Sequence, residues 1–228
     1  MQRLYIEEKS NRFLLILRGG RSGRFDRLYL IDYNISRWAN KLAKGVINKM
    51  KKILFATNPQ KILEFLIQTP GEEYLSKEIQ IAVKISKAGT NFALNDLVSA
   101  GFVRRKKRGK MYLYAVNYEH PIIKQLKVLK VIMFLEPLLK KIRNKSQKII
   151  LYGSSSRGEN TKDSDIDLFV VTNSLPEVEK IIKNSSKGKI IQLIARAPLK
   201  YIEMEKTDPT FYAEIERGIV LWEAKDES

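Results

Sequence analysis

Cysteine is absent from this sequence of 228 residues, and histidine occurs once, as His120. Without cysteine the chain forms no disulfides and no thiolate metal sites, and a single histidine excludes a zinc site built from several histidines. A metal held by this chain therefore has oxygen ligands, which are the ligands that Mg²⁺ and Mn²⁺ prefer.

Long apolar runs are also missing: the run from Phe13 to Leu17, for example, is far shorter than a bilayer requires and is followed by Arg18. The N-terminus lacks the basic head, long apolar stretch and small-residue cleavage site of a signal peptide. We therefore expect an intracellular, cytoplasmic protein with no membrane partner.

Acidic residues are outnumbered, with 25 Asp and Glu against 42 Lys and Arg, which gives a formal net charge of +17. Such an excess favours a polyanionic partner, and nucleic acid ranks ahead of a membrane surface because no basic amphipathic anchor stands out. The alternative is a solvated basic surface that only aids solubility. The length fits one large domain or two to three small ones.

Two aspartates lie one residue apart, after a polar loop that follows an apolar run. Side chains alternate between the faces of a strand, so Asp165 and Asp167 are predicted to point the same way while Ile166 points into the core. Neighbouring carboxylates repel each other, and a bound divalent cation would remove that repulsion. The preceding Gly153 and Ser154 allow backbone N–H groups and a hydroxyl to approach a phosphate closely. The pattern indicates a metal and phosphate site.

The order Gly153-Ser154, Arg157-Gly158 and Ser164-Asp165-Ile166-Asp167-Leu168 resembles the signature of the minimal nucleotidyltransferases, a branch of the DNA polymerase beta superfamily. The alternative is a polar hairpin between two core strands with solvated aspartates.

The resemblance implies that Asp165 and Asp167 are catalytic ligands of Mg (or Mn), and that Gly153 and Ser154 cradle the triphosphate of an NTP. Arg157 either reaches a phosphate or anchors the loop. The family's third carboxylate belongs on a later strand, where this sequence has Gln192, and a neutral amide is a poor replacement for an acid there. Catalysis is therefore left open.

Residues 1–52 are predicted as a separate small module. Apolar runs over Arg3–Glu7, Arg12–Arg18 and Arg27–Asp32 predict an antiparallel sheet, and helical spacing from Ser36 to Lys52 predicts a helix over it. This order resembles a single PUR-type nucleic-acid-binding repeat. Such repeats act in pairs, so a lone copy implies a homodimer or an unrelated fold. A β-meander with a covering helix used for dimerisation is an equal alternative.

Residues 53–120 carry the pattern of three helices and a basic hairpin. The helices are predicted over Lys61–Thr69, Leu75–Val83 and Lys87–Ala100, and the strands over Phe102–Arg105 and Met111–Val116. This order, and the run LNDLVSAGFVRRKKRGKMYLYAV, resembles a winged helix-turn-helix.

That resemblance implies binding of double-stranded DNA. The third helix offers donor-rich side chains suited to base edges, namely Lys87, Thr90, Asn91 and Asn95. The hairpin offers cations suited to phosphates, namely Arg104, Arg105, Lys106, Lys107, Arg108 and Lys110. A hairpin that docks on a protein or stays solvated is the alternative.

Apolar positions from His120 to Ser146 predict a long helix that Pro137 kinks or divides. Residues 121–136 are assigned to a linker helix and residues 137–228 to a minimal nucleotidyltransferase-like domain. The fold class is thus α+β and multidomain: an N-terminal β-meander plus helix, a winged helix-turn-helix, and a C-terminal polymerase-beta-like α/β nucleotidyltransferase domain.

Two functions from different classes follow. The first is a DNA-binding enzyme that transfers NMP, most simply AMP, from NTP to a hydroxyl of a protein or nucleic acid. The second is a winged-helix regulator whose transferase-like domain binds nucleotide or mediates assembly without catalysis. A scaffold paired with a toxin-like partner ranks third, on fold-level analogy.

Overall fold

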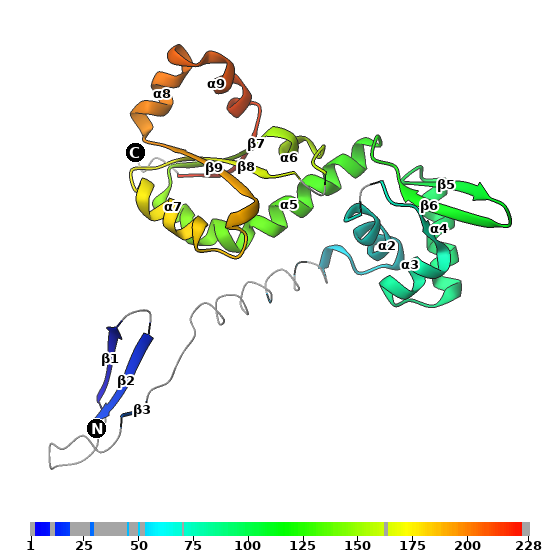
Figure 1. Ribbon diagram of the computed structural model, residues 1–228, viewed down its shortest axis with the longest axis horizontal. Coiled ribbons are helices and arrows are strands. Elements are labelled where there is room, and N and C mark those ends of the chain that lie inside the picture. Colours follow the sequence, from blue (N-terminus) through cyan, green and yellow to red (C-terminus); the bar gives the residue numbers. More distant parts are fainter. Residues whose placement is uncertain are drawn as a thin grey trace. The chain divides into compact units, whose positions relative to one another are not determined.

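The structure is a computed structural model that describes residues 3–9, 12–18, 28–29, 45, 50, 53–69, 71–161 and 164–224 (Figure 1). The chain divides into two compact units, Met1–Lys49 and Met50–Ser228. Of the described helices, none is both long enough and apolar enough to cross a membrane.

The first unit contains the antiparallel sheet that the sequence predicts. Its strands pair in the order β1-β2-β3 and are β1 (Arg3–Lys9), β2 (Arg12–Arg18) and β3 (Leu28–Tyr29). The helix predicted over Ser36–Lys52 lies outside the described residues, apart from Gly45 and Met50, which are helical. The PUR-type resemblance and the homodimer stay predictions.

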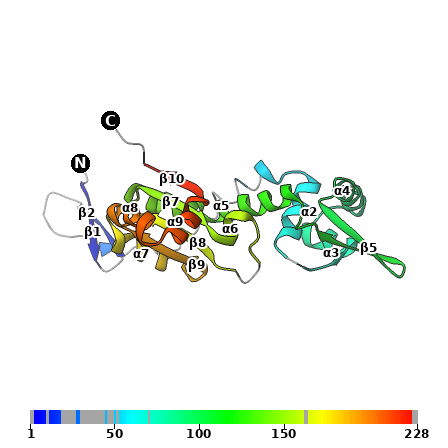
Figure 2. The same cartoon turned by 90° about the horizontal axis from the view of Figure 1, so that it is seen from above.

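The second unit begins with the predicted helices and hairpin. The elements are α2 (Asn58–Ile67), β4 (Tyr74–Leu75), α3 (Ser76–Val83), α4 (Lys87–Ser99), β5 (Val103–Arg108) and β6 (Met111–Val116). The three strands pair antiparallel in the order β4-β6-β5. In both views the tip of the β5–β6 hairpin extends beyond the three helices (Figures 1 and 2).

Local sequence signals account for where these helices begin. Thr57 and Gln60 form a capping box at the start of α2, and the Ser86 hydroxyl accepts a hydrogen bond from the Gly89 N–H at the start of α4. Gly101 follows α4 with a φ of +74°, a left-handed conformation that ends helices. The helices then bury their apolar faces in one core, whose fully buried members include Ile62, Leu66, Ile79, Leu94 and Ile123.

The helix α5 (Pro121–Ile142) is shared by two cores. Ile123 packs in the core of α2–α4, whereas Leu135, Leu138 and Ile142 pack in the core beneath the following sheet. Pro137 lies inside the helix, so the predicted division at this residue is not present. Buried leucines on both sides of the proline pack against the same sheet, and this packing keeps the helix continuous.

The remaining elements form a four-stranded mixed sheet covered on both faces. Its order is β10-β7-β8-β9, with β8 and β9 parallel and the other pairs antiparallel. The strands are β7 (Lys148–Tyr152), β8 (Ile166–Val171), β9 (Ile191–Arg196) and β10 (Ile219–Glu223). The helices are α6 (Gly153–Arg157), α7 (Leu175–Lys183), α8 (Pro198–Thr207) and α9 (Pro209–Glu216), with short 3-10 turns at Arg143–Lys145 and Gly188–Ile190.

Alternation along β8 gives each face of this sheet its own core. Leu168 and Val170 pack toward α5 and α7, whereas Phe169 and Val171 pack toward α8 and α9. Figure 1 shows these two helix pairs on opposite sides of the sheet. Asp167 shares a face with Phe169, so its side chain lies on the α8–α9 side.

Candidate functional site

Three polar side chains form a row across the middle of the sheet. Tyr152 of β7 pairs with Asp167 of β8, which pairs with Gln192 of β9. Paired residues on neighbouring strands point to the same face, so the three side chains are neighbours. Helix α9 borders the row, because the rings of Tyr152 and Phe211 meet edge to face with centroids 5.8 Å apart.

Asp167 lies in a strand as predicted, whereas Asp165 lies just before that strand, so alternation along the strand does not fix the direction of the Asp165 side chain. Ile166 is buried, Asp167 is half-buried at the second position of β8, and Asp165 is exposed just before the strand. The Ser155 hydroxyl donates to the Asp165 carbonyl over 3.4 Å, which ties the segment before β8 to helix α6.

Gly153 lies directly against the Asp167 carboxylate. Its φ is +66°, and a Cβ at this position would lie 2.2 Å from Asp167 Oδ2. Only glycine fits both the left-handed backbone and the close approach. The stretch predicted as a Gly-Ser loop is instead the short helix α6, in which Ser154 is the half-buried second residue. Five residues are too few to show helical periodicity in a sequence.

Burial and the charges around Asp167 shift its pKa. Burial, followed by the nearby charges of Glu214 and Asp165, raises the pKa of Asp167 above its ordinary value, and the positive charge of Arg157 partly opposes the rise. Burial and the charges of Asp167 and Glu214 also raise the pKa of Tyr152 to about 12. The Tyr152 hydroxyl therefore keeps its proton at neutral pH.

Sequence reasoning did not identify Glu214. It is an exposed residue of α9, and its charge acts on both Asp167 and Tyr152. Only the packing of α9 over the sheet brings it there. The aromatic Phe211, one turn earlier, was the one local sign that this side of α9 faces the sheet.

The chemistry of the donors fits a divalent cation at Asp165 and Asp167. Burial and, after it, repulsion by neighbouring carboxylates raise the pKa of Asp167, and a bound cation would relieve that repulsion; carboxylates are also suitable ligands for Mg²⁺ or Mn²⁺. Within the part of the chain that the structure describes, no three acidic, histidine or cysteine side chains form a metal-binding group. The exposed amide of Gln192 stands beside Asp167, where the third acid was expected.

Arg157 is engaged inside its own loop. Its Nε donates to Glu159 Oε2 over 2.8 Å, and both side chains are about half exposed. The ion pair fits the anchoring interpretation of Arg157, but the charge of Arg157 also acts on Asp167, so both interpretations stay predictions. The pair also lowers the pKa of Glu159.

The loop after α6 rests on helix α5. A Cβ on Gly158 would lie 2.2 Å from the Lys124 carbonyl oxygen, so the two backbones are in direct contact. The buried Lys127 donates its Nζ hydrogen bond to the Asn160 carbonyl over 2.6 Å and lies 4.9 Å from the Tyr118 ring centroid. Through Lys127, α5 links the loop before Asp165 to the segment that follows β6.

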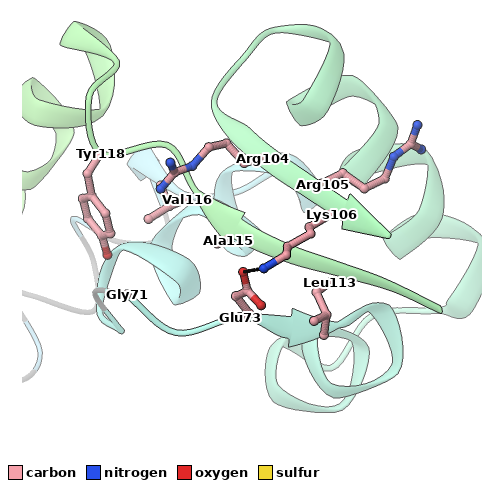
Figure 3. A pocket seen from close by; sticks show the side chains of 9 residues that line it. All are labelled: Gly71, Glu73, Arg104, Arg105, Lys106, Leu113, Ala115, Val116 and Tyr118. Carbon is pink, nitrogen blue, oxygen red and sulfur yellow. Dashed lines mark ion pairs between the residues drawn. The ribbon is translucent and has the colours of Figure 1, made fainter. Parts of the chain in front are cut away.

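The basic side chains of the hairpin divide between its two faces. Residues paired in register share a face, so Arg104 and Lys106 lie with Ala115 and Leu113 (Figure 3). Arg105 lies on the opposite face, with its guanidinium 4.8 Å from the Tyr112 ring centroid. The hairpin cations predicted to meet phosphates are exposed, namely Arg104, Arg105, Lys106, Lys107, Arg108 and Lys110.

Among the residues that the structure describes, Lys106 is the one of these cations that forms an ion pair. Its Nζ is 3.8 Å from Glu73 Oε1, across the shallow hollow that Figure 3 shows. Side-chain exposures of 73% for the lysine and 42% for the glutamate make this a weak surface pair. Lys106 therefore remains able to turn toward a phosphate.

Helix α4 presents three of the four side chains that were assigned to base edges. Lys87, Asn91 and Asn95 are exposed. The prediction is wrong for Thr90, because this residue is fully buried and its hydroxyl donates to the Ser86 carbonyl over 2.9 Å. The residue that sequence reasoning missed on this surface is Phe92, whose side chain is 72% exposed.

Comparisons with known proteins point to one family. Residues 121–220, which begin with α5 and end in β10, match the family described as Nucleotidyltransferase domain. A putative protein adenylyltransferase of Methanocaldococcus jannaschii is 32% identical over 78 residues, which cover 33% of this chain and 77% of that relative.

Proposed function

Because this chain belongs to the nucleotidyltransferase domain family, we propose that it transfers a nucleoside monophosphate from a nucleoside triphosphate to a hydroxyl group. The observation that carries the proposal is the contact of the Asp167 carboxylate with Gly153, beside Asp165. A glycine kept free of a side chain against a carboxylate at the turn out of β7 fits a site that holds a triphosphate and its cation.

In the proposed reaction the acceptor hydroxyl gives up its proton to solvent, its oxygen attacks the α-phosphorus, and the bond from that phosphorus to pyrophosphate breaks. Asp165 and Asp167 would hold Mg or Mn, and Gly153 and Ser154 would cradle the triphosphate. The bound cation would neutralise phosphate charge and lower the pKa of the attacking hydroxyl. Tyr152, with a pKa of about 12, keeps its proton and can donate a hydrogen bond beside Asp167.

The nucleotide and acceptor are proposed from the relative. Its name, putative protein adenylyltransferase, supports AMP as the transferred group and a protein hydroxyl as the acceptor. A nucleic-acid hydroxyl is the second acceptor to test, because the net charge of +17 favours polyanions.

We further propose that residues 53–120 form a winged helix-turn-helix that binds double-stranded DNA. Three helices, with a short strand between the first two, and a basic hairpin follow in the order of that fold, and the hairpin cations are exposed to solvent. Replacing Lys106, Lys107 and Arg108 by alanine should weaken duplex binding and flatten its salt dependence by about 0.9 log unit per lost phosphate contact. If the affinity and the salt dependence are unchanged, these hairpin residues do not contact DNA phosphates.

Gln192 favours one alternative, a regulator that binds nucleotide without turnover. An amide beside Asp167 ligates a cation without adding negative charge, so it holds a second metal poorly. The enzyme and the regulator therefore differ in one measurable quantity, which is label transferred per bound nucleotide.

The deciding experiment incubates the protein with α-labelled ATP, Mg or Mn and candidate acceptors. An enzyme transfers label, and Asp165→Asn or Asp167→Asn abolishes the transfer. A Gln192→Asp variant run in parallel shows whether the amide limits the rate. If neither the native chain nor Gln192→Asp transfers label with either metal, while ATP binding persists, the protein is the regulator.

A further inference from the structure

Helix α4 carries an exposed stripe that mixes one large apolar side chain with two amides. Ala88, Asn91, Phe92 and Asn95 are all exposed and recur at the i, i+3, i+4, i+7 spacing that places residues on one helix face. The opposite face of α4 supplies the core of the domain. The stripe is therefore fixed in position by a packed helix while its own side chains remain accessible.

The two amides of the stripe are held differently. The Ser76 hydroxyl lies 2.9 Å from Asn91 Oδ1, which orients the Asn91 amide and leaves its Nδ2 as a donor. Among the residues that the structure describes, Asn95 has no side-chain hydrogen-bond partner, so both its Oδ1 and its Nδ2 are available.

We infer that this stripe reads A·T base pairs in the major groove, with Phe92 against the C5-methyl group of thymine and Asn95 bidentate to adenine. This inference rests on the proposed binding of DNA by residues 53–120. Asparagine matches the N6 donor and N7 acceptor of adenine, and phenylalanine is among the side chains that contact the thymine methyl.

The composition of the stripe also disfavours guanine. The commonest specific contact to guanine uses arginine or lysine, and none of the four stripe residues is basic; the exposed Lys87 lies outside the stripe, at the start of α4.

The positive charge of the hairpin favours a DNA duplex as the partner of the stripe. Val103 is buried in the core with Leu97 of α4, and alternation along β5 places Arg105 and Lys107 on the same face as Val103. Cations for the phosphates thus lie on the hairpin face that turns toward α4. A protein surface that fits this arrangement would have to be strongly acidic as well as apolar.

The test separates the methyl group from everything else in the duplex. Affinity is measured for a short duplex of A·T pairs in mixed order, for the same duplex with deoxyuridine in place of thymidine, and for a G·C duplex. Deoxyuridine keeps the charge and base pairing and lacks only the methyl. The native chain should bind the thymine duplex about fourfold more tightly than the uracil duplex, which corresponds to about 0.8 kcal/mol for one buried methyl.

Two variants make the test specific. Phe92→Ala should lower the affinity for the thymine duplex to that for the uracil duplex, so that their ratio falls to about one. Ile81→Ala is the matched control, because Ile81 is an apolar residue of α3 that is 65% exposed and lies outside the stripe; the ratio should persist in that variant. Asn95→Ala should lower the preference for A·T over G·C about tenfold, since one bidentate pair contributes that much discrimination.

Each result decides the inference. A native chain that binds both A·T duplexes equally, but still loses affinity when Lys106, Lys107 and Arg108 are replaced, binds DNA without reading thymine, and the inference is wrong. If Phe92→Ala keeps the native affinity and the native ratio between the thymine and uracil duplexes, the stripe lies outside the DNA interface and the inference is wrong. A stripe that docks on a protein would give this result. Absence of binding to every duplex overturns the DNA-binding proposal itself, and the inference falls with it.

Discussion

Replacing Gly153 by alanine tests the site at its tightest contact. Two costs follow from the geometry. At a φ of +66° a residue with a Cβ costs about 1–2 kcal/mol relative to its ordinary conformations. In addition, the Cβ would lie 2.2 Å from Asp167 Oδ2, so the carboxylate must move about 1 Å before ordinary van der Waals contact is reached.

The second cost is the one that bears on function. A displacement of about 1 Å in a reacting group lowers an enzymatic rate about 100-fold. We therefore expect Gly153→Ala to unfold at a lower temperature and, below that temperature, to transfer label about 100-fold more slowly than the native chain. The assay is thermal unfolding followed by single-turnover transfer of label from α-labelled ATP.

Gly109→Ala is the matched control. Gly109 also has a positive φ, of +60°, but a Cβ there would have nothing within 4 Å. Gly109→Ala should therefore lose only the backbone term of about 1–2 kcal/mol and keep the native transfer rate. If Gly153→Ala and Gly109→Ala transfer label at the same rate, the absence of a side chain at Gly153 is not needed to position the Asp167 carboxylate, and the reasoning fails.

Three further predictions concern the loop and the charge of the site. Gly158→Ala should destabilise by about 1–3 kcal/mol more than Gly109→Ala, since its Cβ would strike the Lys124 carbonyl oxygen at 2.2 Å; equal melting temperatures would contradict this. Lys127→Met should destabilise by about 1–3 kcal/mol and speed amide exchange in residues 158–161, because the Asn160 carbonyl loses its donor; unchanged exchange would count against it. Asp167→Asn should be more stable than the native chain at pH 7 without metal. The pKa of Asp167 is raised in the folded state, so its ionisation opposes folding above that pKa, and the advantage should vanish below the ordinary value of 3.8, as melting temperatures across pH would reveal.

Local patterns accounted for much of the fold because caps and periodicity are local. Ser86 and Gly101 bracket α4 as the sequence indicates, and the alternation at Asp165 to Asp167 correctly buries Ile166. The error at Thr90 was avoidable in the same terms. Thr90 stands four and seven residues before Leu94 and Leu97, so it belongs to their buried face.

Long-range placement was beyond the sequence. Helix α6 has no periodicity to read, and the effect of Glu214 on Asp167 depends on how α9 packs over the sheet. The anchoring of the loop by Lys127 likewise requires that α5 lie beneath it. Propensities describe single elements, whereas these contacts arise only when distant elements meet.

Much of the negative charge near Asp167 comes from Glu214, a residue outside the sequence motif. The register places Gln192 beside Asp167, so the position of the expected third acid is retained while its charge is lost. Glu214 contributes a charge from α9 that acts on Asp167 more strongly than that of Asp165. A carboxylate at position 192 would add a further negative charge near Asp167. The neutral Gln192 therefore keeps the repulsion at Asp167 lower when no cation is bound, and it also weakens the binding of a second cation.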